Sequence, residues 1–181
     1  MGTAINILIT KLRASVDRVT VWAGKVDACL TLILTGFISY SVFVRYFLNR
    51  PLWWVEEVTA YIWIYIAALS FPYATMLESH VASDIIFVRF PAKLKYLITV
   101  GGYLMALIVC SVMVLKGISI MKLYYILDWR SDSLLEVPLW IIWVSVPVGF
   151  LLMGLQVVSK IYVITQRQRR TGSVEVPKEL A

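Results

Sequence analysis

The feature that most constrains this chain is a set of four long apolar windows, each free of Asp, Glu, Lys, Arg and His. The windows are Ala28–Val44, Val58–Leu77, Tyr96–Leu115 and Val137–Ser159. A helix of about 20 residues crosses the hydrocarbon core of a bilayer, and each window approaches or exceeds that length. A membrane-spanning strand would instead alternate apolar and polar residues over about ten positions, and none of the windows does so. The chain is therefore predicted to be an all-α membrane protein with four transmembrane helices.

The predicted spans lie within one transmembrane domain, residues 26–165. They cover residues 26–47, 56–77, 94–116 and 137–161. Composition agrees with a lipid environment, because 60% of the residues are hydrophobic, only 15% are charged and the mean hydropathy is +0.81. A soluble domain would carry about a quarter charged residues. The polar surface is thus too small to cover a soluble globule.

The net charge of +6 would suggest a nucleic-acid partner in a soluble protein, but here the distribution of charge matters more. Of the 17 Lys and Arg residues, most lie in the terminal segments or between the second and third windows. The exceptions are Arg45, Arg50, Lys116, Lys122 and Arg130. The positive-inside rule places Lys- and Arg-rich segments in the cytoplasm. Both termini are therefore expected to be cytoplasmic, and no nucleic-acid partner is expected.

Three further segments flank the spans. In residues 1–25, apolar side chains recur at helical spacing between charged ones, which predicts an amphipathic helix lying on the cytoplasmic leaflet. Residues 116–127 could form a periplasmic extension of the third helix. Residues 166–181 are polar without apolar periodicity and are predicted to be a disordered tail. Tryptophans near the span ends are expected to anchor the protein at the membrane surfaces. They are Trp22, Trp53, Trp54, Trp129 and Trp140.

The chain lacks the residue patterns of most catalytic and cofactor sites. It has one histidine, His80, whereas haem-bearing membrane anchors use histidines inside their spans. It has no Gly-rich phosphate loop, and Cys29 and Cys110 form no metal-ligand spacing. The windows also lack the ionisable groups that carry protons or ions through transporters. We therefore expect no enzyme activity, no catalytic or metal-binding residues and no cofactor in this chain.

Motifs in the connecting segments resemble those of one membrane-protein family. VRYFLNRPLWWVEEVTAY, before the second span, contains Arg45, Tyr46, Trp54, Glu56 and Glu57. ESHVASD and FVRFP follow that span, SLLEVPLW leads into the fourth span, and VPVGF lies inside it. In this order, over Asp27 to Ile164, the motifs resemble the small membrane (DctQ-like) subunit of TRAP transporters, the tripartite ATP-independent periplasmic transporters.

This resemblance implies a division of labour among three proteins. A periplasmic substrate-binding protein delivers an organic acid, for example a C4-dicarboxylate or sialic acid, and a large multi-span membrane subunit imports it with sodium. The small subunit would be a scaffold or anchor in the inner membrane of a bacterium or archaeon, surrounded by lipid. Sodium would bind in the large subunit. Two alternatives are a membrane-anchor subunit of a respiratory enzyme and a small self-sufficient transporter.

Glu56 and Glu57 stand at the start of the second span. Adjacent helical residues point about 100° apart, so these carboxylates cannot readily share one proton or one ion. They could cap the helix, whose N-terminal end favours negative charge. Alternatively, one of them could pair with Arg45 or Arg50, or with a basic residue of the large subunit. Trp54 could likewise turn its ring toward the partner.

Two connections carry further candidate residues. His80 and Asp84 could close the loop after the second span, with Asp84 capping a following helix, or His80 could contact lipid headgroups or the partner. On the opposite side of the membrane, four charged residues could touch the binding protein or form a solvated rim. They are Asp128, Arg130, Asp132 and Glu136.

Overall fold

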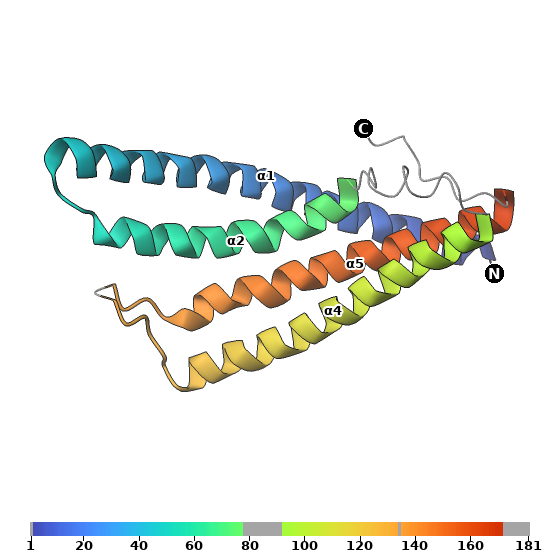
Figure 1. Cartoon of the computed structure of the whole chain (residues 1–181). Helices are drawn as coiled ribbons and strands as arrows, with labels where there is room; N and C mark the ends of the chain where they lie inside the picture. Colours follow the sequence, from blue (N-terminus) through green and yellow to red (C-terminus); the bar gives the residue numbers. More distant parts are fainter. Residues whose placement is uncertain (1, 78–91, 134, 172–181) are drawn as a thin grey trace.

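The computed structural model of the chain describes residues 2–77, 92–133 and 135–171, which form four helices (Figure 1). They are α1 (Gly2–Leu48), α2 (Trp53–Leu77), α4 (Ala92–Ile126) and α5 (Leu139–Thr171). Each helix includes a segment long and apolar enough to cross a membrane. For the described residues, the prediction of an all-α protein with four helices long and apolar enough to span a membrane is thereby confirmed.

The helices pack side by side in the spatial order α1, α2, α5, α4, which differs from their order in the chain (Figure 1). α5 lies between α2 and α4 and packs against both, while α1 packs along α2 and also reaches α5. α1 begins and α5 ends at the same end of the molecule, here called the terminal end. The opposite end, here called the loop end, carries the connections at residues 49–52 and 127–138.

The first helix shows no boundary between the predicted interfacial segment and the first span. α1 runs without interruption from Gly2 to Leu48, because no proline lies within it and its backbone hydrogen bonds can continue. The placement of residues 2–25 on the cytoplasmic leaflet stays a prediction. α1 ends where Asn49 adopts a positive φ of 48° and Pro51 prevents the helix from continuing.

Two other helices extend beyond the predicted spans. α4 continues to Ile126, so the segment after residue 116 is a helical continuation of the third span, and its periplasmic location stays a prediction. α5 continues to Thr171, so the first residues of the predicted tail are helical, while residues 172–181 lie outside the described part. Gln and Arg are good helix formers, so α5 can continue beyond the end of its apolar window at Ser159.

Two prolines inside helices are matched by glycines on neighbouring helices. Pro72 of α2 cannot donate a hydrogen bond to the carbonyl oxygen of Ala68, and Gly149 of α5 packs against that oxygen. A Cβ atom at Gly149 would lie 2.3 Å from Ala68 O, so this approach requires glycine. Gly117 of α4 approaches Pro147 of α5 in a similar way, with a Cβ placed 3.0 Å from Cδ. Small residues allow such close packing of helices in membranes.

Some small residues of α4 are packed against α5, and others are exposed. Cys110 is buried, and a Cβ atom at Gly154 of α5 would lie 3.6 Å from its Cβ atom. Gly101 and Gly102, by contrast, face open space. The apolar core between α4 and α5 is formed by Tyr103, Val157 and Ile164. One face of α4 therefore packs on α5 while another is left exposed.

Candidate functional site at the loop end

The two glutamates at the start of α2 have different partners. Glu56 lies in the first turn of α2, and its Oε1 atom accepts a hydrogen bond from Nη2 of Arg45 at 2.6 Å. Arg45 lies in the last turn of α1, so this ion pair bridges the connection at residues 49–52. Both side chains are more than half exposed. Exposed ion pairs contribute only about 0–1 kcal/mol to stability.

Glu57 faces a different direction, toward the connection between α4 and α5. Its Oε1 atom accepts hydrogen bonds from Tyr61 Oη, one turn later in α2, and from Ser131 Oγ at 2.6 Å. Ser133 Oγ lies 2.9 Å from Ser131 Oγ and extends this network. The angle of about 100° between successive helical residues lets Glu56 bind α1 while Glu57 binds the loop before α5. Glu57 Oε2 is buried and has no hydrogen-bond partner among the described residues.

The 127–138 connection is itself held in a defined shape by its backbone. Ser131 N donates a hydrogen bond to Val137 O at 3.0 Å, and Leu139 N donates one to Trp129 O at 3.1 Å. These bonds close the connection like a short hairpin. The network around Glu57 therefore attaches a folded loop to the beginning of α2.

The four charged residues predicted as a rim are all exposed on this loop. Arg130 Nη2 donates a hydrogen bond to Asp128 Oδ2 at 3.2 Å. Within the ranges that the structure describes, the carboxylates of Asp132 and Glu136 have no ion-pair partner. The loop therefore presents a net negative surface, and electrostatic complementarity would favour a positively charged partner.

The tryptophans predicted as anchors differ in their surroundings. Trp53 and Trp129 lie at the loop end and are half exposed. Trp22 is more exposed still, but it lies well inside α1, because that helix begins far before the predicted first span. Trp54 packs edge-on against the ring of Phe37, with ring centroids 6.2 Å apart.

Two other predicted site residues, Trp140 and Arg50, lie at the loop end, near the start of α5 and in the 49–52 connection. Trp140 packs edge-on against Tyr125, with ring centroids 5.7 Å apart. Arg50, the other predicted partner of the glutamates, is exposed in the 49–52 connection, and no ion pair joins it to another described residue. His80 and Asp84 lie outside the described residues.

A second polar contact lies toward the terminal end and was not among the predicted site residues. The side-chain amide of Gln156 in α5 donates hydrogen bonds to Thr20 Oγ1 at 2.9 Å and to Asp17 Oδ1 at 3.1 Å, both in α1. Gln156 and Thr20 are buried, with exposed fractions of 1% and 0%. Farther along α1, Asp27 Oδ2 accepts a hydrogen bond from Ser70 Oγ of α2 at 2.8 Å.

The sequence contains a signal for this contact, which a search for charged residues alone misses. Gln156 is the one amide side chain inside the four apolar windows. Such a group must find hydrogen-bond partners at membrane depth. Thr20 and Asp27 lie about two turns apart on one face of α1, which marks the face that packs on other helices.

Each of these polar groups connects two parts of the helix row. The Arg45–Glu56 pair joins α1 to α2, Glu57 joins α2 to the loop before α5, and Gln156 joins α5 to α1. Within residues 2–77, 92–133 and 135–171, no group of three or more His, Cys, Asp or Glu side chains is arranged to hold a metal ion. The arrangement is suited to fixing the positions of helices.

Comparison with known proteins agrees with the motifs in the connections. Residues 34–167, more than half of the chain, match the family described as tripartite ATP-independent periplasmic transporters, DctQ component. The matched range includes both glutamates, Ser131 and Gln156, but not Asp17 or Thr20. Among curated proteins, none matches the chain. The chain therefore belongs to the family of DctQ components of tripartite ATP-independent periplasmic transporters.

Proposed function

We propose that this chain is the scaffold subunit of a sodium-coupled importer of an organic acid, with sodium and substrate bound in the large membrane subunit. Family membership makes it a small TRAP transporter subunit, and its four apolar helices make it a multi-pass membrane protein. The observation that carries the proposal is that its polar side chains hold its own helices together. Glu57 binds the loop before α5, and Gln156 binds α1. Side chains used in this way support a static role without catalysis.

A static role suits an importer in which part of the large subunit moves through the bilayer, because the moving part needs a fixed surface. The four helices form a row (Figure 1), and many of their large apolar side chains are exposed. One apolar face of the row would pack against the large subunit while the other faces lipid. The exposed rings of Trp53 and Trp129 would hold the loop end at the membrane surface and resist tilting.

The proposed orientation places the terminal end in the cytoplasm and the loop end in the periplasm, in the inner membrane of a bacterium or archaeon. The excess of Lys and Arg in the terminal segments supports this orientation. The exposed, negatively charged 127–138 connection then faces the side from which the binding protein approaches. We assign the contact with that protein to this connection.

Reconstitution tests the scaffold role directly. The large subunit and the binding protein are placed in proteoliposomes with or without this chain, and uptake of a labelled organic acid is measured under an inward sodium gradient. Uptake should be lost without the chain, although the transport sites are present. Uptake at the full rate in its absence would contradict the proposal. Flux through proteoliposomes that hold this chain alone would instead support a self-sufficient transporter.

Charge reversal at Glu57 tests whether the internal contacts serve the assembled transporter. Glu57→Lys removes the acceptor for Ser131 and Tyr61 and places a cation in their site. Co-purification with the large subunit and uptake should both fall. If both survive, the connection made by Glu57 is not needed for scaffolding, and that part of the proposal is wrong.

A further inference from the structure

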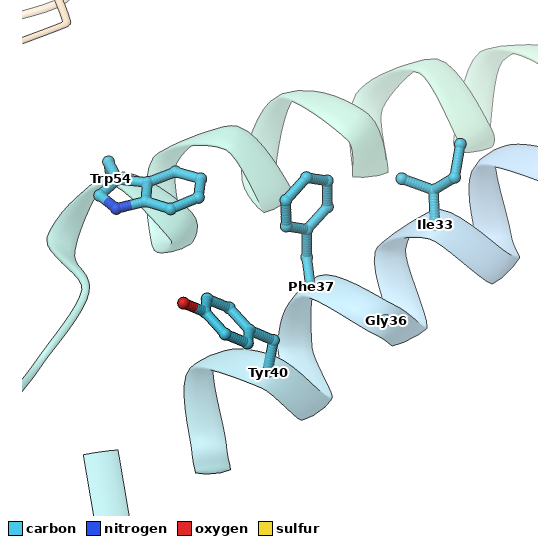
Figure 2. A pocket seen from close by; sticks show the side chains of 5 residues that line it. All are labelled: Ile33, Gly36, Phe37, Tyr40 and Trp54. Atoms are coloured by element: carbon cyan, nitrogen blue, oxygen red, sulfur yellow. The ribbon is translucent and has the colours of Figure 1, made fainter. Parts of the chain in front are cut away.

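An open groove lies between α1 and α2, and its lining residues take no part in the polar contacts described above. Four residues of α1 line it, Ile33, Gly36, Phe37 and Tyr40, together with Trp54 of α2 (Figure 2). Its volume is about 390 Å³. The α1 residues recur at helical spacing and form one stripe along the helix. At a rise of 1.5 Å per residue, the stripe is about 10 Å long.

The floor of the groove is the backbone at Gly36. A Cβ atom at this position would meet nothing within 4 Å, although Ile33, Phe37 and Tyr40 are large. The edge-on contact between Phe37 and Trp54 forms one wall. A glycine inside a helix costs about 1 kcal/mol relative to alanine, and this one gains no packing within the described chain in return. The hollow at Gly36 is thus suited to a ligand that lies along α1.

One end of the groove offers hydrogen-bond donors. Figure 2 shows the hydroxyl oxygen of Tyr40 and the indole nitrogen of Trp54 on the same side of the groove, toward the loop end. Among the described residues, neither group has a hydrogen-bond partner. The indole N–H can only donate, and the phenol can donate as well. Aromatic side chains with one polar atom favour this depth, where hydrocarbon meets the headgroup layer.

A cation lies at the same end of the two helices. Arg50 is exposed in the 49–52 connection, four residues before Trp54, and forms no ion pair with any other described residue. The two other arginines at the loop end are already paired, Arg45 with Glu56 and Arg130 with Asp128. The groove therefore offers an apolar surface with two donors at its loop end, and a positive charge lies in the adjoining 49–52 connection. A glycerophospholipid presents the complementary order of an acyl chain, ester carbonyl oxygens and an anionic phosphate.

We propose that this groove binds one glycerophospholipid of the leaflet at the loop end. The acyl chain lies over Gly36, an ester carbonyl oxygen accepts hydrogen bonds from Tyr40 and Trp54, and the phosphate pairs with Arg50. A helix of a partner protein fits the groove less well. The carbonyl oxygens of a membrane helix are already paired internally and cannot readily accept from Tyr40 and Trp54, whereas ester carbonyl oxygens are free to accept.

Native mass spectrometry of the full-length chain tests this site. The purified protein is stripped of lipid, titrated with dioleoyl phosphatidylglycerol and examined for one lipid that is retained when others dissociate. Gly36→Leu fills the floor of the groove, and the affinity for the retained lipid should fall at least about tenfold, equivalent to about 1.4 kcal/mol. The matched control is Gly101→Leu on α4, which also faces open space and should leave occupancy unchanged. Equal retention by both variants would overturn the proposal.

A second comparison tests the hydrogen bonds at the mouth of the groove. Tyr40→Phe and Trp54→Phe keep aromatic rings but remove the donors, so each should weaken retention of the ester lipid several-fold. An ether-linked phosphatidylglycerol, which lacks the carbonyl oxygens, should bind the unaltered chain less tightly and be indifferent to both substitutions. Equal binding of the two lipids would refute the proposed contacts. If Gly36→Leu leaves lipid retention intact but abolishes co-purification with the large subunit, the groove holds a partner helix and the proposal fails. Circular dichroism confirms that each variant is folded.

Discussion

The side chain at the centre of the loop-end contact differs from the one at the centre of the terminal-end contact in both charge and burial. At the loop end, the Glu57 carboxylate accepts hydrogen bonds from Tyr61 and Ser131 in partly buried surroundings. At the terminal end, the central group is the neutral amide of Gln156, which lies buried between α5 and α1 and donates to Thr20 and to the partly buried carboxylate of Asp17. Both contacts hold α5, or the loop before it, against the first two helices.

The difference reflects the cost of removing charge from water. An ionised group far from water costs several kcal/mol unless it is paired, so it is best used near the end of a helix. A neutral amide needs only hydrogen-bond partners and can be used inside a spanning segment. The chain places Glu57 five residues into the 25-residue helix α2 and Gln156 deep within α5. Substitutions should therefore weaken the two contacts to different extents.

The largest loss of stability is expected for a substitution at Gly149, which lies between the two contacts. Gly149→Ala places a Cβ atom 2.3 Å from Ala68 O and forces α2 and α5 apart, which should loosen both ends and cost about 3 kcal/mol. Thermal unfolding of the purified protein in detergent measures this. The matched control, Gly102→Ala, meets open space on α4 and should stabilise the protein by up to about 1 kcal/mol. If the two substitutions change the stability in the same direction, the close approach of Gly149 to Ala68 O is contradicted.

The next largest loss of stability is expected when the buried contact at the terminal end is removed. Gln156→Leu keeps the side-chain volume but leaves Thr20 and Asp17 without the amide, which should lower stability by about 2 kcal/mol. Adding Thr20→Val should recover part of this loss, because replacing both polar partners by apolar groups leaves fewer unsatisfied atoms. Unfolding midpoints of the two single variants and the double variant form a double-mutant cycle. Strictly additive losses would show that the hydrogen bond between Gln156 and Thr20 contributes nothing.

The charged contact at the loop end should be less costly to lose. Glu57→Gln keeps the shape of the side chain but weakens its hydrogen bonds with Ser131 and Tyr61, and the unfolding midpoint should fall by about 2–4 °C. Ser131→Ala should have a similar effect, and the double variant should be little worse than either single one, since both remove the same contact. Glu136→Gln, on the exposed part of the same loop, is the control and should not shift the midpoint.

The smallest loss of stability is expected when the exposed ion pair between Arg45 and Glu56 is broken. Arg45→Gln removes the partner of Glu56, and because both side chains are more than half exposed, the loss should stay within about 0.5 kcal/mol. Raising the salt concentration should reduce the difference from the unaltered protein further. A loss as large as that of Gln156→Leu would show that the lipid environment strengthens this pair far beyond its exposure.

Much of the fold was predictable because each spanning segment is visible locally. The four windows correspond to the four spanning helices, and the motifs around Glu56 and Glu57 indicated the family. The pairing of Glu56 with Arg45 was one of several alternatives that the sequence left open, and the structure brings those two residues together. The role of Ser131 was not predictable, because 74 residues separate it from Glu57. Gln156 was overlooked because it carries no charge.

The sequence by itself determined the number of spanning helices, because an apolar segment in lipid must satisfy its backbone hydrogen bonds internally, and a helix does so within one stretch of chain. Only the tertiary structure decided that α5 lies between α2 and α4, and that Gln156 meets Thr20. Lipid is as apolar as the helix surfaces, so the hydrophobic effect does not select the neighbours of a helix. Close approach at glycines and hydrogen bonds between distant residues select them instead.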